Sequence, residues 1–75
     1  MNEFLKYLAE EFEKEGIGRQ FDGEIMFTVP LSLGKTIDEE GSELYFMVNR
    51  HNRAIYQFKN EDQVKAIFGM VLNGI

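Results

Sequence analysis

The start of the chain shows the hydrophobic spacing of an amphipathic helix. Apolar side chains recur there at intervals of three or four residues, which places them on one helix face. Asn2 can cap the first turn, and Gly16 can adopt the left-handed conformation that ends the last turn. The pattern predicts a helix over residues 3–15 whose core face carries Phe4, Leu5, Leu8 and Phe12.

The end of the chain gives a clearer helical signal. Asn60 can cap a helix there, Gln63 can complete a capping box, and Gly74 can end the last turn. The two acidic residues that follow Asn60 suit the positive end of a helix dipole. The core face of this second helix is predicted to carry Val64, Ile67, Phe68, Val71 and Leu72.

Between the two helices, apolar and polar residues alternate with the period of two that is typical of β-strands. The longest alternation covers residues 25–33, where every odd-numbered residue is apolar, and its Pro30 indicates an edge strand or a bulge. Asp22-Gly23, just before this run, is a turn signal. Residues 34–41 are predicted as a polar loop, residues 43–50 as the second strand and residues 54–59 as the third.

The alternation also assigns a face to each side chain of the second and third strands. Tyr45 and Met47 are assigned to the outer face of the second strand. Because Val48 and Tyr56 must then share the inner face, the intervening loop needs an odd number of residues, most simply His51-Asn52-Arg53. The other inward positions of these two strands are Leu44, Phe46, Ala54 and Phe58.

The order α-β-β-β-α predicts a two-layer α+β fold, in which a three-stranded antiparallel meander has both helices on one face. The 75 residues are enough for a single domain over residues 1–75. A domain of this size has a small core, and the absence of cysteine excludes disulfides and thiolate metal sites. Oligomerisation or partner binding is the remaining source of extra stability.

Composition restricts the class of partner. The chain has 13 acidic and 8 basic residues, a net charge of −5, which disfavours nonspecific binding to nucleic acid. We see no signal peptide and no apolar run long enough for a membrane span. Together with the lack of cysteine, these features predict a cytoplasmic protein that does not bind membranes.

The sequence contains no recognisable catalytic, metal or cofactor site. His51 is the single histidine, and it falls at a predicted hairpin tip, where water cannot be excluded. Gly34-Lys35-Thr36 matches the end of a phosphate-binding loop, but Val29 stands where that motif needs its first glycine. We therefore expect a protein that is not an enzyme, with no catalytic residue, no metal ligand and no cofactor.

The element order is similar to that of double-stranded-RNA-binding domains, over the whole chain but in topology alone. In that family the last helix begins with a lysine-rich segment that grips phosphates. Here the segment reads Asn60-Glu61-Asp62-Gln63, with Lys65 as its one lysine, and the family's Gly-Pro-containing loop between the first two strands is absent. The resemblance implies a compact scaffold rather than RNA binding.

The outer side of the last helix is a candidate binding surface. No charged residue occurs between Ala66 and Ile75, although a solvated helix face normally carries charges. Gly69 costs about 1 kcal/mol relative to alanine in a helix interior, which the close approach of another backbone would offset. The alternative is that the first helix packs there. The predicted partner-binding residues are Ala66, Gly69, Met70 and Asn73.

The outer face of the sheet is a second candidate. An open antiparallel sheet usually presents a polar face to water, whereas this one is expected to present methionine and other apolar side chains. The alternative is that long Lys and Arg side chains, or the segment around Phe21, cover it. The predicted partner-binding residues are Met26, Thr28, Tyr45, Met47 and Ile55.

These features predict a small acidic protein-binding module that acts as an accessory or inhibitory protein. Its partner is another protein, a second copy of the chain in a homodimer, or both. One variant of this hypothesis is an acidic mimic of nucleic acid. It requires one continuous surface of Glu10, Glu11, Asp38, Glu39 and Glu40. The alternative function is a nucleic-acid-binding domain that uses the basic hairpin tip, where the anion contacts would be Arg50, His51 and Arg53.

Overall fold

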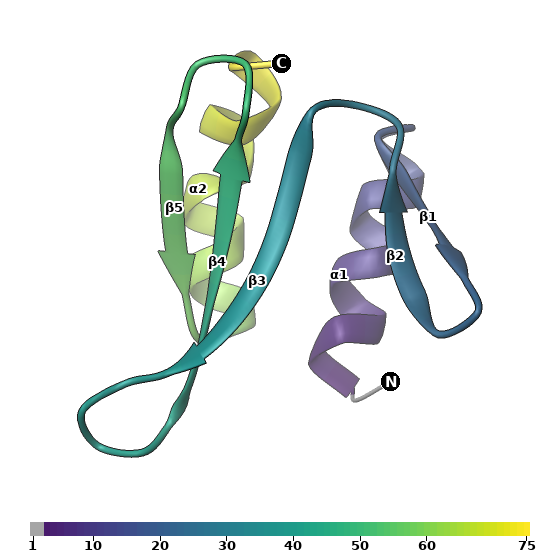
Figure 1. Ribbon diagram of the computed structural model, residues 1–75. Helices are drawn as coiled ribbons and strands as arrows, with labels where there is room; N and C mark the ends of the chain where they lie inside the picture. Colours follow the sequence, from purple (N-terminus) through teal and green to yellow (C-terminus); the bar gives the residue numbers. More distant parts are fainter. Residues whose placement is uncertain (1–2) are drawn as a thin grey trace.

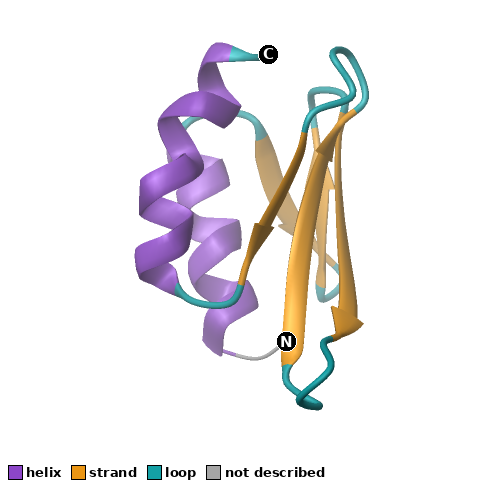
Figure 2. Ribbon diagram, turned by 90° about the vertical axis from the view of Figure 1, so that its left-hand side faces the viewer, coloured by secondary structure: helices purple, strands orange, loops and turns teal. Residues whose placement is uncertain are grey.

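The computed structural model describes residues 3–75, and its two helices lie in one layer that covers the strands (Figure 2). α1 (Glu3–Lys14) ends as predicted, because Gly16 has a φ of +71° and the N–H of Ile17 donates back to the last turn at 3.0 Å. The predicted cap of this helix, Asn2, lies outside the described residues.

α2 (Glu61–Asn73) begins at its predicted cap. The side chain of Asn60 accepts a hydrogen bond from the N–H of Gln63 at 3.0 Å. The side chain of Gln63 in turn accepts one from the N–H of Lys59 at 2.6 Å, so the return bond reaches the residue before the cap. Gly74 ends the helix, as predicted, but stays right-handed with a φ of −86°.

Five strands form where the alternation predicted three. They are β1 (Gly18–Phe21), β2 (Glu24–Phe27), β3 (Leu31–Ile37), β4 (Glu43–Asn49) and β5 (Ile55–Phe58). β3, β4 and β5 make the predicted antiparallel meander, and the α+β class is confirmed. β1 and β2 form an additional hairpin that the sequence did not predict. Its turn is Asp22-Gly23, where both φ angles are positive, as a tight two-residue hairpin requires.

The predicted first strand, residues 25–33, is divided between the two sheets. The N–H of Thr28 still donates to the β1 side at 3.0 Å, whereas the carbonyl of Pro30 accepts from the N–H of Arg50 at 2.8 Å. The chain therefore changes sheets at Val29 and Pro30, where proline has no N–H to continue the first ladder. The alternation itself survives the break, because Ile25, Phe27, Val29, Leu31 and Leu33 all pack against the core. Residues 34–37, predicted as loop, complete β3.

The predicted register of the second and third strands is wrong. Val48 lies opposite Ile55, and the N–H of Asn49 donates to the carbonyl of Ala54 at 2.9 Å. Four residues, 50–53, therefore separate the last paired positions, whereas the prediction required an odd number. This register reverses the faces of β4. Tyr45 and Met47 point into the core with exposures of 4% and 1%, while Leu44, Phe46 and Val48 lie on the outer face.

The buried side chain of Asn49 explains this register. Its amide nitrogen donates to the carbonyl of Gly74 at 2.8 Å, and its amide oxygen accepts from the N–H groups of His51 at 2.8 Å and Asn52 at 3.4 Å. An inward Asn49 fixes Met47 and Tyr45 on the same face, since alternate strand residues share a side. A buried amide that is fully hydrogen-bonded stabilises this arrangement over the alternative one.

The core lies between the helices and both sheets. α1 covers the β1–β2 hairpin and α2 covers the meander, and the two helices lie side by side (Figure 1). Phe12 of α1 joins these parts, because its ring lies 5.1 Å from that of Phe27 in β2 and 5.9 Å from that of Phe68 in α2. Phe4 at the other end of α1 reaches the ring of Tyr45 at 5.1 Å.

Candidate protein-binding surfaces

The predicted binding face of α2 is exposed. Among the described residues, a Cβ added to Gly69 would meet no atom within 4 Å outside its own helix, and Met70 is 54% exposed. Ala66 and Asn73 are exposed beside them. The alternative that α1 packs on this face is wrong, because α1 contacts the opposite, core side of α2 through Phe68.

This α2 face, defined by Ala66, Gly69, Met70 and Asn73, combines three properties. It has no charged side chain over its last turns, it contains a glycine that permits close backbone approach, and it carries one flexible apolar side chain. A helix face of this kind can pack closely against another helix without burying a charge.

The predicted binding residues of the sheet do not form one surface. Tyr45 and Met47 are buried beneath the helices, so neither can face a partner. Met26, 46% exposed, and Thr28 lie on or just after β2 in the hairpin, whereas Ile55 lies on β5 of the meander. The prediction failed because β4 is apolar on both sides, so its alternation could not identify the inner face.

The actual outer face of the meander is covered by an aromatic ring. Phe46 lies opposite Gly34 in the register, and a Cβ on Gly34 would come within 2.3 Å of its Cζ atom. The far end of the ring therefore lies over the glycine, and Val48 and Ile55 lie beside it on the same face of the sheet. Sequence reasoning missed this contact, although a strand glycine is itself a signal of close approach by another group.

The tip of the β4–β5 loop presents basic side chains to solvent. Arg50, His51 and Arg53 are all exposed, and within residues 3–75 none of them forms an ion pair. Arg53 has a positive φ of 66°, and its N–H donates to the carbonyl of Asn49 at 2.7 Å. The loop is thus held by backbone hydrogen bonds and by the side chains of Asn49 and Asn52, and the guanidinium groups of Arg50 and Arg53 are available to an anion.

The predicted acidic surface is not continuous. Glu10 and Glu11 belong to α1, whereas residues 38–40 lie in the β3–β4 loop at the far end of the strand layer (Figures 1 and 2). Asp38 is also engaged, because it pairs with Lys59 and accepts from the N–H groups of Glu40 and Ser42 at 2.9 Å. The hydrogen bond from Lys59 and those from the backbone lower the pKa of the Asp38 carboxyl.

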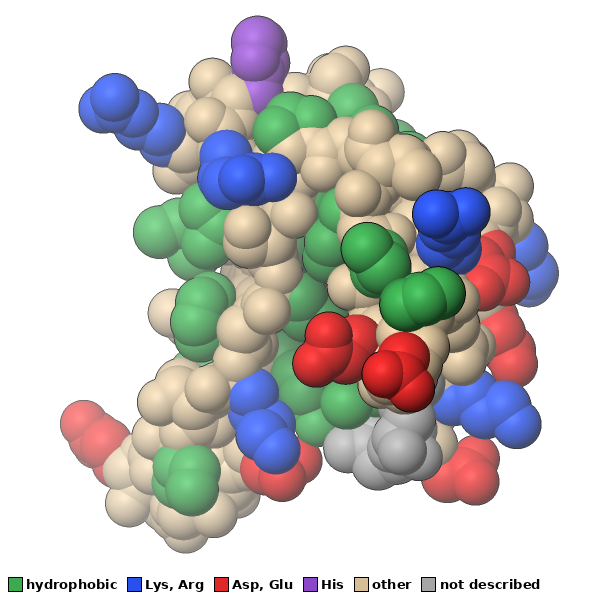
Figure 3. Space-filling view, turned by 45° about the vertical axis from the view of Figure 1, so that its right-hand side comes forward, with side chains coloured by type: hydrophobic (Ala, Val, Ile, Leu, Met, Phe, Trp, Pro, Cys, Tyr) green, Lys and Arg blue, Asp and Glu red, His purple; other side chains and the backbone are tan. Residues whose placement is uncertain are grey.

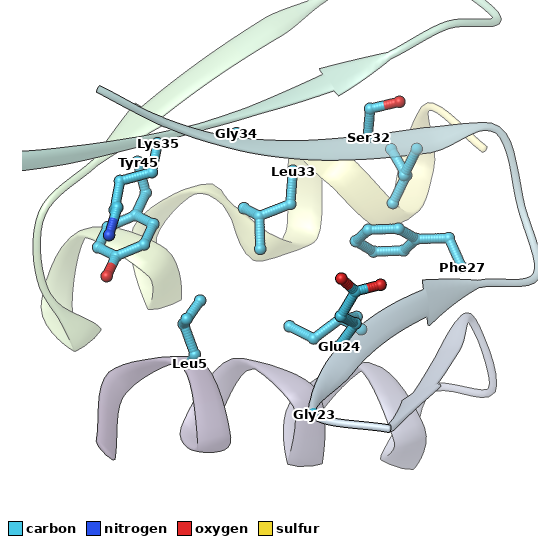
Figure 4. Close-up of a pocket in the computed structure, with 11 residues that line it drawn as sticks. Leu5, Gly23, Glu24, Phe27, Ser32, Leu33, Gly34, Lys35 and Tyr45 are labelled. Carbon is cyan, nitrogen blue, oxygen red and sulfur yellow. The ribbon is translucent and has the colours of Figure 1, made fainter. Parts of the chain in front are cut away.

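A cleft opens between β2 and β3, where the two sheets separate. It encloses about 480 Å³, and hydrophobic side chains form its floor (Figure 3). In the close-up, Leu33 of β3 and Leu5 of α1 point toward each other across it, and the carboxylate of Glu24 stands on the β2 wall (Figure 4). The other apolar lining residues are Ile25, Phe27 and Leu31.

The cleft was not predicted, because it exists only where the run of residues 25–33 changes sheets. Pro30 was the one signal of such a break. Gly34 and Lys35 line its β3 wall. The whole segment Gly34-Lys35-Thr36 is part of an extended strand, which excludes a phosphate-binding loop there.

Within residues 3–75, no three potential metal-ligating side chains gather, and neither helix is long and apolar enough to cross a membrane. A scan against protein-family models, a search of curated proteins and a search of solved structures each gave no match to this chain. The topological similarity to double-stranded-RNA-binding domains is further limited by the β1–β2 hairpin, which lies outside the α-β-β-β-α order.

Proposed function

We propose that this protein is a small acidic protein-binding module that is not an enzyme, acts in the cytoplasm as an accessory or inhibitory protein, and self-associates through the α2 face. The observation that carries the proposal is the glycine in the middle of this face. Gly69 lowers helix stability by about 1 kcal/mol relative to alanine, and no contact within residues 3–75 requires it. A second helix backbone packed against Gly69 would use the space that a side chain would fill.

The charge distribution favours the same face for self-association. Two copies that each carry a net charge of −5 repel one another, so their contact is most favourable where neither copy has a charge. The α2 face is such a place, because α2 has no charged residue after Lys65. A twofold axis through Gly69 would place the α2 face of one copy against the same face of the other copy, as in closed homodimers.

Sedimentation velocity tests this proposal. The protein concentration is varied from about 1 to several hundred micromolar, a range of roughly two decades. The chain is expected to dimerise, and Met70→Glu is expected to weaken the dimer at least about tenfold by placing like charges across the axis. Gln57→Glu adds the same charge at an exposed position on β5 and serves as the control. A monomer at every concentration, or equal dimerisation of both variants, would contradict the proposal.

A second candidate function is favoured by the exposed basic tip. Because Arg50 and Arg53 have no ion-pair partner within residues 3–75, both guanidinium groups can contact phosphates. Binding of single-stranded DNA or duplex RNA at low salt should then disappear in Arg50→Ala/Arg53→Ala. The matched control is Lys6→Ala/Lys65→Ala, which changes the net charge equally on the helices. An absence of binding to either nucleic acid at low salt would reject this candidate.

A further inference from the structure

The edge of β3 that is not paired with β4 faces the cleft. β3 runs over seven residues, and within residues 3–75 its single sheet partner is β4. Alternate residues of an edge strand direct their N–H and C=O groups away from the sheet, so the second edge of β3 offers backbone hydrogen bonds to an added strand. Proteins usually blunt or cover such edges, and here the edge borders the cleft.

The shape of the cleft restricts what can reach this edge. The β1–β2 hairpin stands opposite β3, and α1 closes the floor through Leu5 (Figure 4). Because the hairpin faces the free edge of β3 across the cleft, a single extended chain, which needs a spacing of about 4.8 Å from its neighbouring strand, is the simplest occupant. The ribbons of β2 and β3 diverge from the segment that joins them (Figure 1). The added chain would therefore enter between the start of β2 and the end of β3, where Gly23 and Lys35 line the cleft.

The lining defines the side chains of such a segment. One face of an added strand would rest on the apolar floor, where Leu33 and Ile25 are both half-buried. Alternate residues of the segment should therefore be apolar, since strand side chains alternate between two faces.

The charges at the cleft call for a basic residue in the segment. On the β2 wall, the carboxylate of Glu24 forms no ion pair within residues 3–75. On the β3 side, the ammonium of Lys35 is already paired with Glu43 at 3.3 Å, and the same carboxylate accepts from the hydroxyl of Tyr45 at 3.1 Å. The unmatched charge that faces the cleft is thus negative, and a lysine or arginine of the segment would complement it.

We propose that the cleft binds an extended segment of a partner protein, which adds to the free edge of β3 as a fourth strand. Its apolar side chains alternate into the cleft, and a basic side chain lies near Glu24. This site goes beyond the proposed self-association and uses a different surface, so either can fail without the other. Recognition by strand addition draws its affinity from backbone bonds and its selectivity from alternate side chains.

Synthetic ten-residue peptides of alternating valine and threonine with one central lysine are suitable probes for the intact 75-residue chain. Their addition should shift the backbone amide NMR signals of β3 and slow hydrogen exchange there. A peptide with proline at two alternate positions should lose binding at least about tenfold, because proline cannot donate to the ladder. Amide shifts confined to α2, or equal binding of the proline peptide, would overturn strand addition.

A charge swap tests the role of Glu24. Replacing the central lysine of the peptide by glutamate should weaken binding roughly twofold to fivefold, as expected of a solvent-exposed ion pair. In Glu24→Lys the preference should reverse, so that the glutamate peptide binds better. Glu24 is exposed at the end of a tight turn, and circular dichroism would verify that the variant folds. An unchanged preference in Glu24→Lys would overturn the pairing of Glu24 with the basic residue of the segment.

The identity of the occupant has its own test. If the signals of β3 shift with protein concentration and not with any peptide, the occupant is a second copy of the chain, and the proposed binding of a partner segment is overturned.

Discussion

The run of residues 25–33 and strand β4 show when hydrophobic alternation identifies the inside of a sheet. In the first, Thr28 and Ser32 interrupt the apolar residues, and the predicted inward side chains all pack against the core even though the chain changes sheets. In β4, residues 44–48 are all apolar, and the predicted faces are reversed. Alternation therefore determines a face only where the opposite positions include polar residues. In β4 a polar group outside the run, Asn49, makes the choice.

Two methionines give the largest expected contrast between these regions. Met47 of β4 is 1% exposed and Met26 of β2 is 46% exposed. Met47→Ala should lower the free energy of unfolding by about 2–5 kcal/mol, because it leaves a cavity in the core. Met26→Ala should change it by less than about 0.5 kcal/mol. Urea denaturation of both variants measures the difference, and equal losses would mean that β4 faces the other way.

Asn49 should give the next largest effect. Asn49→Ala removes the donor to Gly74 and the acceptor for His51, which leaves two partly buried hydrogen bonds unmade. The expected loss is about 1–3 kcal/mol in the free energy of unfolding. Asn52→Ala is the control, because its side chain makes one exposed bond to the N–H of Ala54. If the two variants lose equal stability, Asn49 does not select the register.

The glycines on the two sides of the molecule should respond to alanine with opposite signs. Gly69→Ala should raise the free energy of unfolding of the monomer by about 1 kcal/mol, because nothing lies near the added methyl group. Gly34→Ala should lower it by about 1 kcal/mol, because the ring of Phe46 must move off the strand. In a Phe46→Ala background the Gly34→Ala loss should vanish. A loss that persists there would show that the ring is not its cause.

The smallest expected effect concerns the loop between β3 and β4. The pKa of Asp38 is lowered in the folded state, chiefly by its hydrogen bond from Lys59. Its stabilising contribution is therefore complete above the unfolded pKa of about 4 and is lost as the pH falls through the lower folded pKa. Asp38→Asn keeps an acceptor for the loop N–H groups but loses this charge. Below about pH 4, the free energy of unfolding of this variant should fall less steeply with decreasing pH than that of the unsubstituted chain. Parallel curves for the two proteins would contradict the assignment of this pH dependence to Asp38.

The sequence predicted the elements whose signals are local. Both helices, their ends at Gly16 and Asn60, the Asp22-Gly23 turn and the exposed face around Gly69 follow from caps, turns and spacing within a few residues. The register of β4 and β5 depends on a bond from Asn49 to Gly74, which are 25 residues apart, and was predicted wrongly. The cleft likewise depends on two sheets that meet only in the folded chain, so no local pattern could reveal it.

The natural absence of cysteine permits a direct test of the central claim that α2 faces meet in a homodimer. A single cysteine placed at Met70 should form an intermolecular disulfide rapidly under mild oxidation at micromolar concentration, since symmetric copies bring the two side chains together. A cysteine at Gln57, equally solvent-facing but in the strand layer, should cross-link far more slowly. Faster cross-linking through Met70→Cys is the result that self-association predicts. Equal rates at the two positions would contradict it.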